Sequence, residues 1–298
     1  MFEGKNVKVG MAPLTWSNDD MPSLGEYCTT EQCLSEIALA GFAGTEIGRK
    51  FPTDITVLKR MLDIRGLTIG SRWFSSTLCE EGTYEDNEKR FLKHLVDLAV
   101  LHGEHVHVAE VTHCTFTEDV PLLGEHPVAS PEEMDRLCDG LNKLGKIAAE
   151  HGIKLCLHPH MGTVVQTMEE TLYVMEHTDP RYVYLCYDSG HVLLAGDDPA
   201  AVCEQLADRI GHVHLKDIRQ RKMEECREKG WKFRDAVIEG CFTIPGEGCI
   251  DFTPIFMTLD KIGYEGWIMI EAEQDPAKAN PYETALKARH YMQDRTGL

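Results

Sequence analysis

Eight short apolar runs alternate with longer segments of helical periodicity along almost the whole chain, and this alternation constrains the fold most strongly. The predicted strands are 7–16, 44–48, 67–74, 105–111, 154–157, 184–187, 210–213 and 267–270. The predicted helices are 29–40, 54–64, 84–101, 131–150, 167–177, 199–209, 252–262 and 281–293. Regular alternation of strands and helices implies parallel strands. The sequence therefore predicts an α/β protein built on a parallel sheet.

This sheet either closes into a barrel or stays open. A (β/α)8 barrel needs about 250 residues, close to the 298 of this chain. An open sheet that binds a nucleotide would carry a GxGxxG or P-loop motif, and neither follows the first strand. Glycines instead follow predicted helices, as at Gly41, Gly66 and Gly152, where barrel turns lead into the next strand. We therefore predict one (β/α)8 barrel spanning residues 1–298 rather than two smaller domains.

The longest connection after a predicted strand is 218–250, and it mixes charged with aromatic residues. In a barrel, the loops that follow strands lie on the catalytic face. A long loop there often closes over the site, so we predict a lid. A solvated helical excursion is the alternative interpretation.

Charge and cysteine content limit the partners and the compartment. The net charge of -19 argues against nucleic acid, which requires clustered Lys and Arg, and against an anionic membrane surface. It is compatible with a neutral polar substrate. The eleven cysteines form no CxxC pair and many lie in apolar runs, which favours reduced thiols in a cytoplasmic protein. We expect neither a signal peptide nor a membrane span.

Four consecutive predicted strands end in residues that can bind a metal ion: His158, Asp188, His214 and Glu271. The carboxyl ends of barrel strands converge on one face, and neighbouring strands are about 4.8 Å apart. Two imidazoles and two carboxylates suit Mn, Co, Fe or Zn better than Ca or Mg. Each residue alone is more often structural than functional, but four at successive strand ends predict one metal site.

Three more polar residues lie beside these strand ends. His160 and Lys216 each follow a predicted ligand by two residues, so they share its face of the strand. His191 follows Asp188 by three residues, in what we expect to be an exposed turn. We predict that these three transfer protons or contact substrate. An ion pair with a ligand carboxylate is the alternative role for Lys216.

Earlier strand ends are predicted to form the opposite wall of the pocket. An aromatic ring there would pack on an apolar ring face, and an amide or carboxylate would bind hydroxyl groups. The candidate residues are Trp16, Asn18, Glu46, Arg72 and Trp73. Burial in the barrel mouth is the alternative for the two tryptophans.

Several motifs resemble the xylose isomerase-like barrel superfamily. DSGH, HVHLKD and IEAE end three predicted strands, and HPH ends the strand before them. Within the superfamily, APLTWSNDD, GFAGTEIGRKFP, HPHMGTVVQT, DSGHVLLAG and GEGCIDF resemble the inosose dehydratase family over essentially the whole chain. The superfamily's usual ligand set is a carboxylate, an Asp, a His and a Glu. His158 stands where that first carboxylate is expected, so whether His158 or His160 meets the metal stays open.

The resemblance implies dehydration of a keto-inositol, scyllo-inosose, to a trihydroxycyclohexane-dione in inositol catabolism. It implies Mn²⁺ or Co²⁺ as the metal and glutathione as a further cofactor, although no sequence feature identifies a glutathione site. The expected base for the α-proton is Lys216 first, then His191 or His160. Family barrels often associate, which suggests a homo-oligomer.

Three other functions compete with dehydration. A sugar epimerase or isomerase would use the same barrel and similar ligands, normally with two acidic residues flanking the substrate. An abasic-site endonuclease would need several metals and a basic face, which the charge opposes. A metal-dependent carbohydrate-binding or sensor protein would show no turnover.

Overall fold

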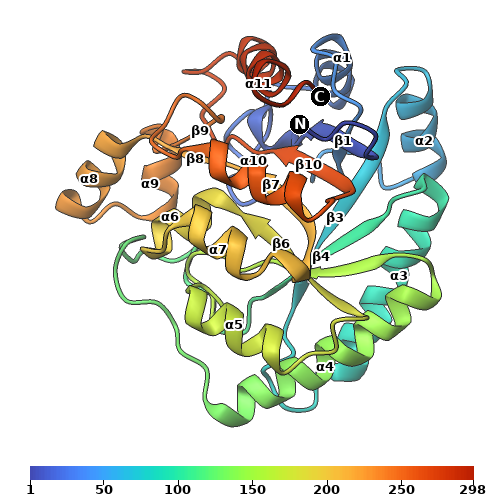
Figure 1. The fold of residues 1–298 in the computed structure, drawn as a ribbon, viewed down its shortest axis with the longest axis vertical. Helices are drawn as coiled ribbons and strands as arrows, with labels where there is room; N and C mark the ends of the chain where they lie inside the picture. Colours follow the sequence, from blue (N-terminus) through green and yellow to red (C-terminus); the bar gives the residue numbers. More distant parts are fainter.

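The computed structural model describes residues 1–298 and forms one closed barrel of parallel strands (Figure 1). The strand order around the barrel is β1-β10-β7-β6-β5-β4-β3-β2, and β2 pairs back with β1 to close it. The predicted (β/α)8 barrel is confirmed. The strands are β1 (Val7–Met11), β2 (Gly44–Glu46), β3 (Thr68–Ser76), β4 (His105–Glu110), β5 (Lys154–Leu157), β6 (Val183–Asp188), β7 (Ile210–Leu215) and β10 (Gly266–Ile270).

One layer of helices surrounds the barrel. They are α1 (Thr30–Leu39), α2 (Ile55–Asp63), α3 (Tyr84–Leu101), α4 (Pro131–Glu150), α5 (Met168–Glu176), α7 (Pro199–Gln205), α10 (Phe252–Lys261) and α11 (Pro281–Thr296). Local chemistry sets their starts: the Ser130 and Thr167 side chains form capping boxes at α4 and α5. An apolar core of 58 buried residues fills the space between strands and helices. None of the helices is apolar and long enough to cross a membrane.

A short helix, α6 (Ser189–Ala195), directly follows β6 and was not predicted. Asp188 starts it, because its Oδ1 accepts the backbone N–H groups of Gly190 and His191 at 2.8 and 2.9 Å. The expectation of an exposed turn at His191 is therefore wrong. His191 lies in the first turn of α6 and is 2% exposed.

The connection 218–250 folds as a small subdomain beside the barrel mouth (Figure 1). It contains α8 (Gln220–Lys229) and α9 (Phe233–Ile238), and β9 (Phe242–Thr243) pairs antiparallel with β8 (Asp217–Ile218). Its apolar side chains join a separate core of 12 residues that includes Met21 and Met161 from other loops of the mouth. Its role as a lid stays a prediction.

Candidate metal centre and catalytic pocket

A polar pocket opens at the carboxyl ends of the barrel strands. Its walls combine the ends of β5, β7 and β10 with the loop after β1, and its space including the open mouth is about 650 Å³. The residues lining it are Pro13, Leu14, Asp19, Asp20, Glu46, Ile47, Trp73, His107, His158, His160, His191, His214, Lys216, Glu271 and Glu273. Most of these side chains are polar or charged, as a polyhydroxylated ligand would require.

The four predicted metal ligands converge at the base of this pocket. His214 Nδ1 lies 3.2 Å from His158 Nε2, 3.5 Å from Glu271 Oε2 and 3.7 Å from Asp188 Oδ2. His158 Nε2 lies 3.8 Å from Asp188 Oδ2. All four residues are at most 5% exposed. One ligand atom each from Asp188, His214 and Glu271 lies within 4.8 Å of the others, and these could hold a divalent metal ion. His158 Nε2 borders this set through His214 and Asp188.

The free oxygen of Asp188 fits such an ion. Its Oδ1 caps α6, whereas its Oδ2 is buried and has no hydrogen-bond partner. Burial raises the pKa of Asp188, and Glu271 raises it further, against the opposing effects of Lys216 and His214. Buried carboxylates are costly without a compensating cation, so the donor set favours a bound metal.

His158, and not His160, reaches the donor atoms. His160 Nδ1 lies 2.8 Å from the carbonyl oxygen of Met161, to which it must donate because a carbonyl only accepts. This bond leaves His160 Nε2 with the lone pair. Burial, with help from the charge of Lys216, lowers the pKa of His160 to about 3, so its ring is neutral.

Lys216 lies just past β7 and is 1% exposed. Its Nζ lies 2.6 Å from Glu273 Oε1, 3.1 Å from Glu271 Oε2 and 3.2 Å from His191 Nε2. Burial opposes its charge, but Glu273, Glu271 and Asp188 outweigh burial and hold the pKa of Lys216 well above its ordinary value. The ion pair considered from the sequence is present, and Lys216 still lines the pocket.

Only some of the residues predicted for the opposite wall lie at the pocket. Trp73 lines the pocket, with its ring centroid 5.3 Å from that of His158. Asn18 lies behind the wall and donates to Glu273 Oε2 at 3.3 Å. Trp16 and Arg72 are not brought to the pocket. Trp16 donates to Glu36 of α1, and Arg72 points outward to Asp97 of α3 because it alternates with Trp73 along β3.

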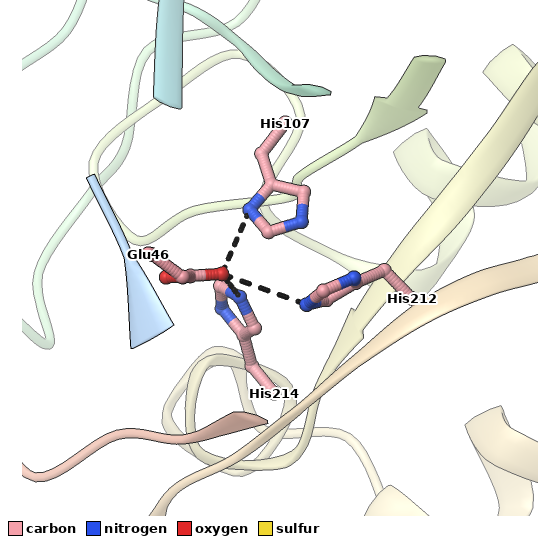
Figure 2. A group of neighbouring side chains, drawn as sticks. All are labelled: Glu46, His107, His212 and His214. Carbon is pink, nitrogen blue, oxygen red and sulfur yellow. Dashed lines mark hydrogen bonds and ion pairs between the residues drawn. The ribbon is translucent and has the colours of Figure 1, made fainter. Parts of the chain in front are cut away.

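Glu46 lines the pocket but also anchors a cluster of histidines below it (Figure 2). Its Oε1 lies 2.9 Å from His214 Nε2, 3.4 Å from His107 Nδ1 and 3.5 Å from His212 Nε2. The Ser71 hydroxyl donates to the same oxygen. Glu46 thus contacts the ring nitrogen of His214 that faces away from the predicted metal, a common arrangement around metal-binding histidines.

Sequence reasoning missed Glu273, His107 and His212. Glu273 follows Glu271 by two residues in the IEAE motif, so the period of a strand was sufficient to find it. His212 precedes His214 by the same two residues. His107 lies in β4, where His105 and His107 repeat the HxH spacing of HPH and HVH, so the same period was sufficient to find it.

Comparisons with known proteins agree with this architecture. The family described as "Xylose isomerase-like TIM barrel" matches residues 34–294. Inosose dehydratases from Clostridium tetani and from Geobacillus thermodenitrificans are each 48% identical to this chain, with 100% of both chains covered. A crystal structure of the IolI protein with a bound zinc atom has a TM-score of 0.74 at 16% identity and covers 97% of this chain and 98% of that one. This last likeness concerns the fold alone.

Proposed function

The chain belongs to the inosose dehydratase family of xylose isomerase-like TIM barrels, and we propose that its pocket removes water from scyllo-inosose. The product would be a trihydroxycyclohexane-dione. The observation that carries the chemistry is the position of Lys216, which joins the donor cluster to the pocket wall through Glu271 and Glu273. A proton-bearing group therefore stands beside the place where a ketone would be held.

His158, Asp188, His214 and Glu271 would hold the metal, for which we propose Mn²⁺ or Co²⁺. When bound, such an ion supplies a Lewis acid for the oxygen atoms of a hydroxyketone. The imidazole of His158, in place of a carboxylate, leaves the donor set with one negative charge fewer. Glu46 supports the set by accepting the Nε2 proton of His214, which keeps Nδ1 free.

Dehydration next to a ketone needs one proton acceptor and one proton donor. The proton positions favour His160 Nε2 as the acceptor of the α-proton, because its other nitrogen is committed to Met161. They favour the Lys216 ammonium as the donor to the departing hydroxyl. His191 lies beside it, with Nε2 3.2 Å from Lys216 Nζ and Nδ1 accepting the N–H of Met161. This order reverses the preference drawn from the sequence, in which Lys216 was the first choice as base.

The remaining parts of the proposal concern the substrate and the cell. The Trp73 ring would pack against the carbon ring, while Asp19 and Glu46 face the hydroxyl groups. Glutathione is proposed as a cofactor from the family resemblance alone, and we assign no residues to bind it. A cytoplasmic location and a homo-oligomer stay predictions.

A direct assay tests this function. Metal-loaded protein incubated with scyllo-inosose, with and without glutathione, should form a conjugated dione that absorbs in the ultraviolet. The Glu271→Ala variant should form none, because it lacks one donor. Interconversion of keto sugars without dione formation would instead identify an epimerase and contradict the proposal.

A further inference from the structure

The histidine cluster below the pocket has buried nitrogen atoms that nothing in the chain satisfies. His212 is 0% exposed; its Nδ1 has no hydrogen-bond partner, and its Nε2 has only a 3.5 Å approach to Glu46 Oε1. His107 is 1% exposed, and its Nε2 also lacks a partner. Buried polar atoms in native proteins are nearly always paired with protein, water or an ion. Both ring nitrogens of the neighbouring His105 are also buried and unpartnered, so the convergence of the other three rings on Glu46 is what distinguishes the cluster.

The spacing of the inner atoms fits a metal ion. His107 Nδ1, His212 Nε2 and His214 Nε2 lie 3.4, 3.5 and 2.9 Å from Glu46 Oε1. One ligand atom from each residue lies within 4.8 Å of every other. An ion about 2.0–2.2 Å from four tetrahedral ligands separates those ligands by about 3.3–3.6 Å. The separations of His107 and His212 from Glu46 match this range, whereas the shorter one to His214 is a hydrogen-bond distance that has to widen when an ion enters. Figure 2 shows the three rings converging on this carboxylate oxygen, that of His107 from β4 and those of His212 and His214 from β7.

We propose that Glu46, His107, His212 and His214 form a second, inner metal site that takes a zinc-class divalent cation. Three imidazole nitrogens and one carboxylate oxygen suit Zn²⁺ and disfavour Mg²⁺ and Ca²⁺, which prefer oxygen. The site lies one layer deeper in the barrel than the Asp188–Glu271 centre. It does not depend on which substrate the pocket takes.

His214 connects the two sites, because its Nδ1 faces Asp188 and Glu271 while its Nε2 faces Glu46. An inner ion takes the place of the Nε2 proton, which passes to solvent. The ring is then an imidazolate that binds one ion on each side. The Glu46 carboxylate and this imidazolate balance the two positive charges, so the buried site carries no net charge.

The ion content of matched variants tests the proposal. Protein loaded with Zn²⁺, dialysed against metal-free buffer and analysed by mass spectrometry should hold about two ions per chain. His107→Asn and His212→Gln keep an amide where the ligand nitrogen was, and each should reduce the ratio to about one. His105→Gln is the control: His105 is equally buried and its ring centroid lies 4.9 Å from that of His212, yet it makes no contact with Glu46. It should retain about two ions.

Asp188→Asn separates this proposal from the proposed function. It removes an outer ligand only, so about one ion should remain, held at the inner site. A ratio unaffected by Asp188→Asn would refute the outer centre and leave the inner one. A wild-type ratio of about one that His212→Gln does not change would overturn the inner site, and the rings would then only orient His214 or hold water. If circular dichroism shows that His212→Gln does not fold, the ion content of Asp188→Asn decides. An Asp188→Asn protein that holds no ion would refute the inner site.

Discussion

Lys216 is the one lysine or arginine among the residues that line the pocket. Its Nζ has three carboxylates within 3.8 Å, those of Glu273, Glu271 and Asp188. Desolvation alone would favour a neutral amine, but three nearby anions reverse that preference. Ser189 fixes the backbone beneath it, since its hydroxyl donates to the carbonyl oxygen of Lys216 and accepts its N–H. Lys216 is therefore held in place as a charged proton donor.

Replacing Lys216 should affect chemistry more than metal binding. We expect Lys216→Met to lower kcat by roughly 10²–10⁴-fold, the usual contribution of a general acid or base. Ion content should be unchanged, because the amine is not a ligand atom. Lys154→Met is the control, since Lys154 is exposed at the opposite end of β5 and should keep full activity. An unaltered kcat in Lys216→Met would remove it from the mechanism.

The period of a strand explains which site residues were predictable. His158, His214 and Glu271 were expected at the pocket because each ends an apolar run, and Lys216 because it lies two residues after His214. All four line it, and their roles there stay predictions. Trp16 was misplaced because β1 already ends at Met11 and a short 3-10 helix follows it. The choice between His158 and His160 needed a tertiary fact, the bond from His160 to the Met161 carbonyl.

Several elements have two roles at once. Asp188 ends β6, caps α6 with one oxygen and directs the other to the donor cluster. Gly190 lets α6 pass close to Lys216, because a Cβ there would lie 2.7 Å from Lys216 Cγ.

The contact between β3 and α3 is a second example. Arg72 and Asp97 form an ion pair across it, beside the half-buried ring of His94. Here packing creates a pH-sensitive contact far from the pocket.

The β3–α3 contact should make folding sensitive to acid. Burial lowers the pKa of His94 to about 4, and Arg72 acts in the same direction. Below a pH of about 6.5 the unfolded chain therefore binds a proton at this site that the folded chain does not, so stability falls as the pH drops from about 6.5 to about 4. His94→Gln should remove roughly 1–2 kcal/mol of this loss, a value discounted for partial exposure.

Urea unfolding at pH 7 and pH 5 measures the effect of His94. The difference in unfolding free energy between the two pH values should be smaller for His94→Gln than for the wild type. His290→Gln, an exposed histidine on α11, should match the wild type. Equal pH dependence in all three proteins would show that His94 does not titrate differently in the folded and unfolded states.

In the whole molecule, the polar and charged side chains of the candidate site lie at one end of a barrel with an apolar core. The barrel was predictable because eight strand-and-helix units repeat with glycines after the helices. The fold of the subdomain at 218–250 was not predictable, because its charged and aromatic residues follow no single period. Its apolar residues also pack with Met21 and Met161 from other loops. The donor cluster likewise exists only when β5, β6, β7 and β10 are assembled side by side.

This dependence on assembly predicts that a bound ion stabilises the whole barrel. An ion that binds only the folded chain at 100 times its Kd adds about 2.7 kcal/mol. For a protein of this size that corresponds to roughly 4 °C in Tm. Adding excess Mn²⁺ to chelator-treated protein should produce this shift in a thermal melt, and further chelation should reverse it.

A variant without one outer ligand separates this stabilisation from general cation binding. With a net charge of -19, the surface alone attracts divalent cations. Glu271→Gln retains that surface but loses a donor atom of the cluster, so Mn²⁺ should raise its Tm much less. If Glu271→Gln gained as much as the wild type, the stabilisation would come from surface charge, and the four strand ends would not form a metal centre. Because binding links the ends of separate strands, the loss in Glu271→Gln should appear as one cooperative shift of the melt.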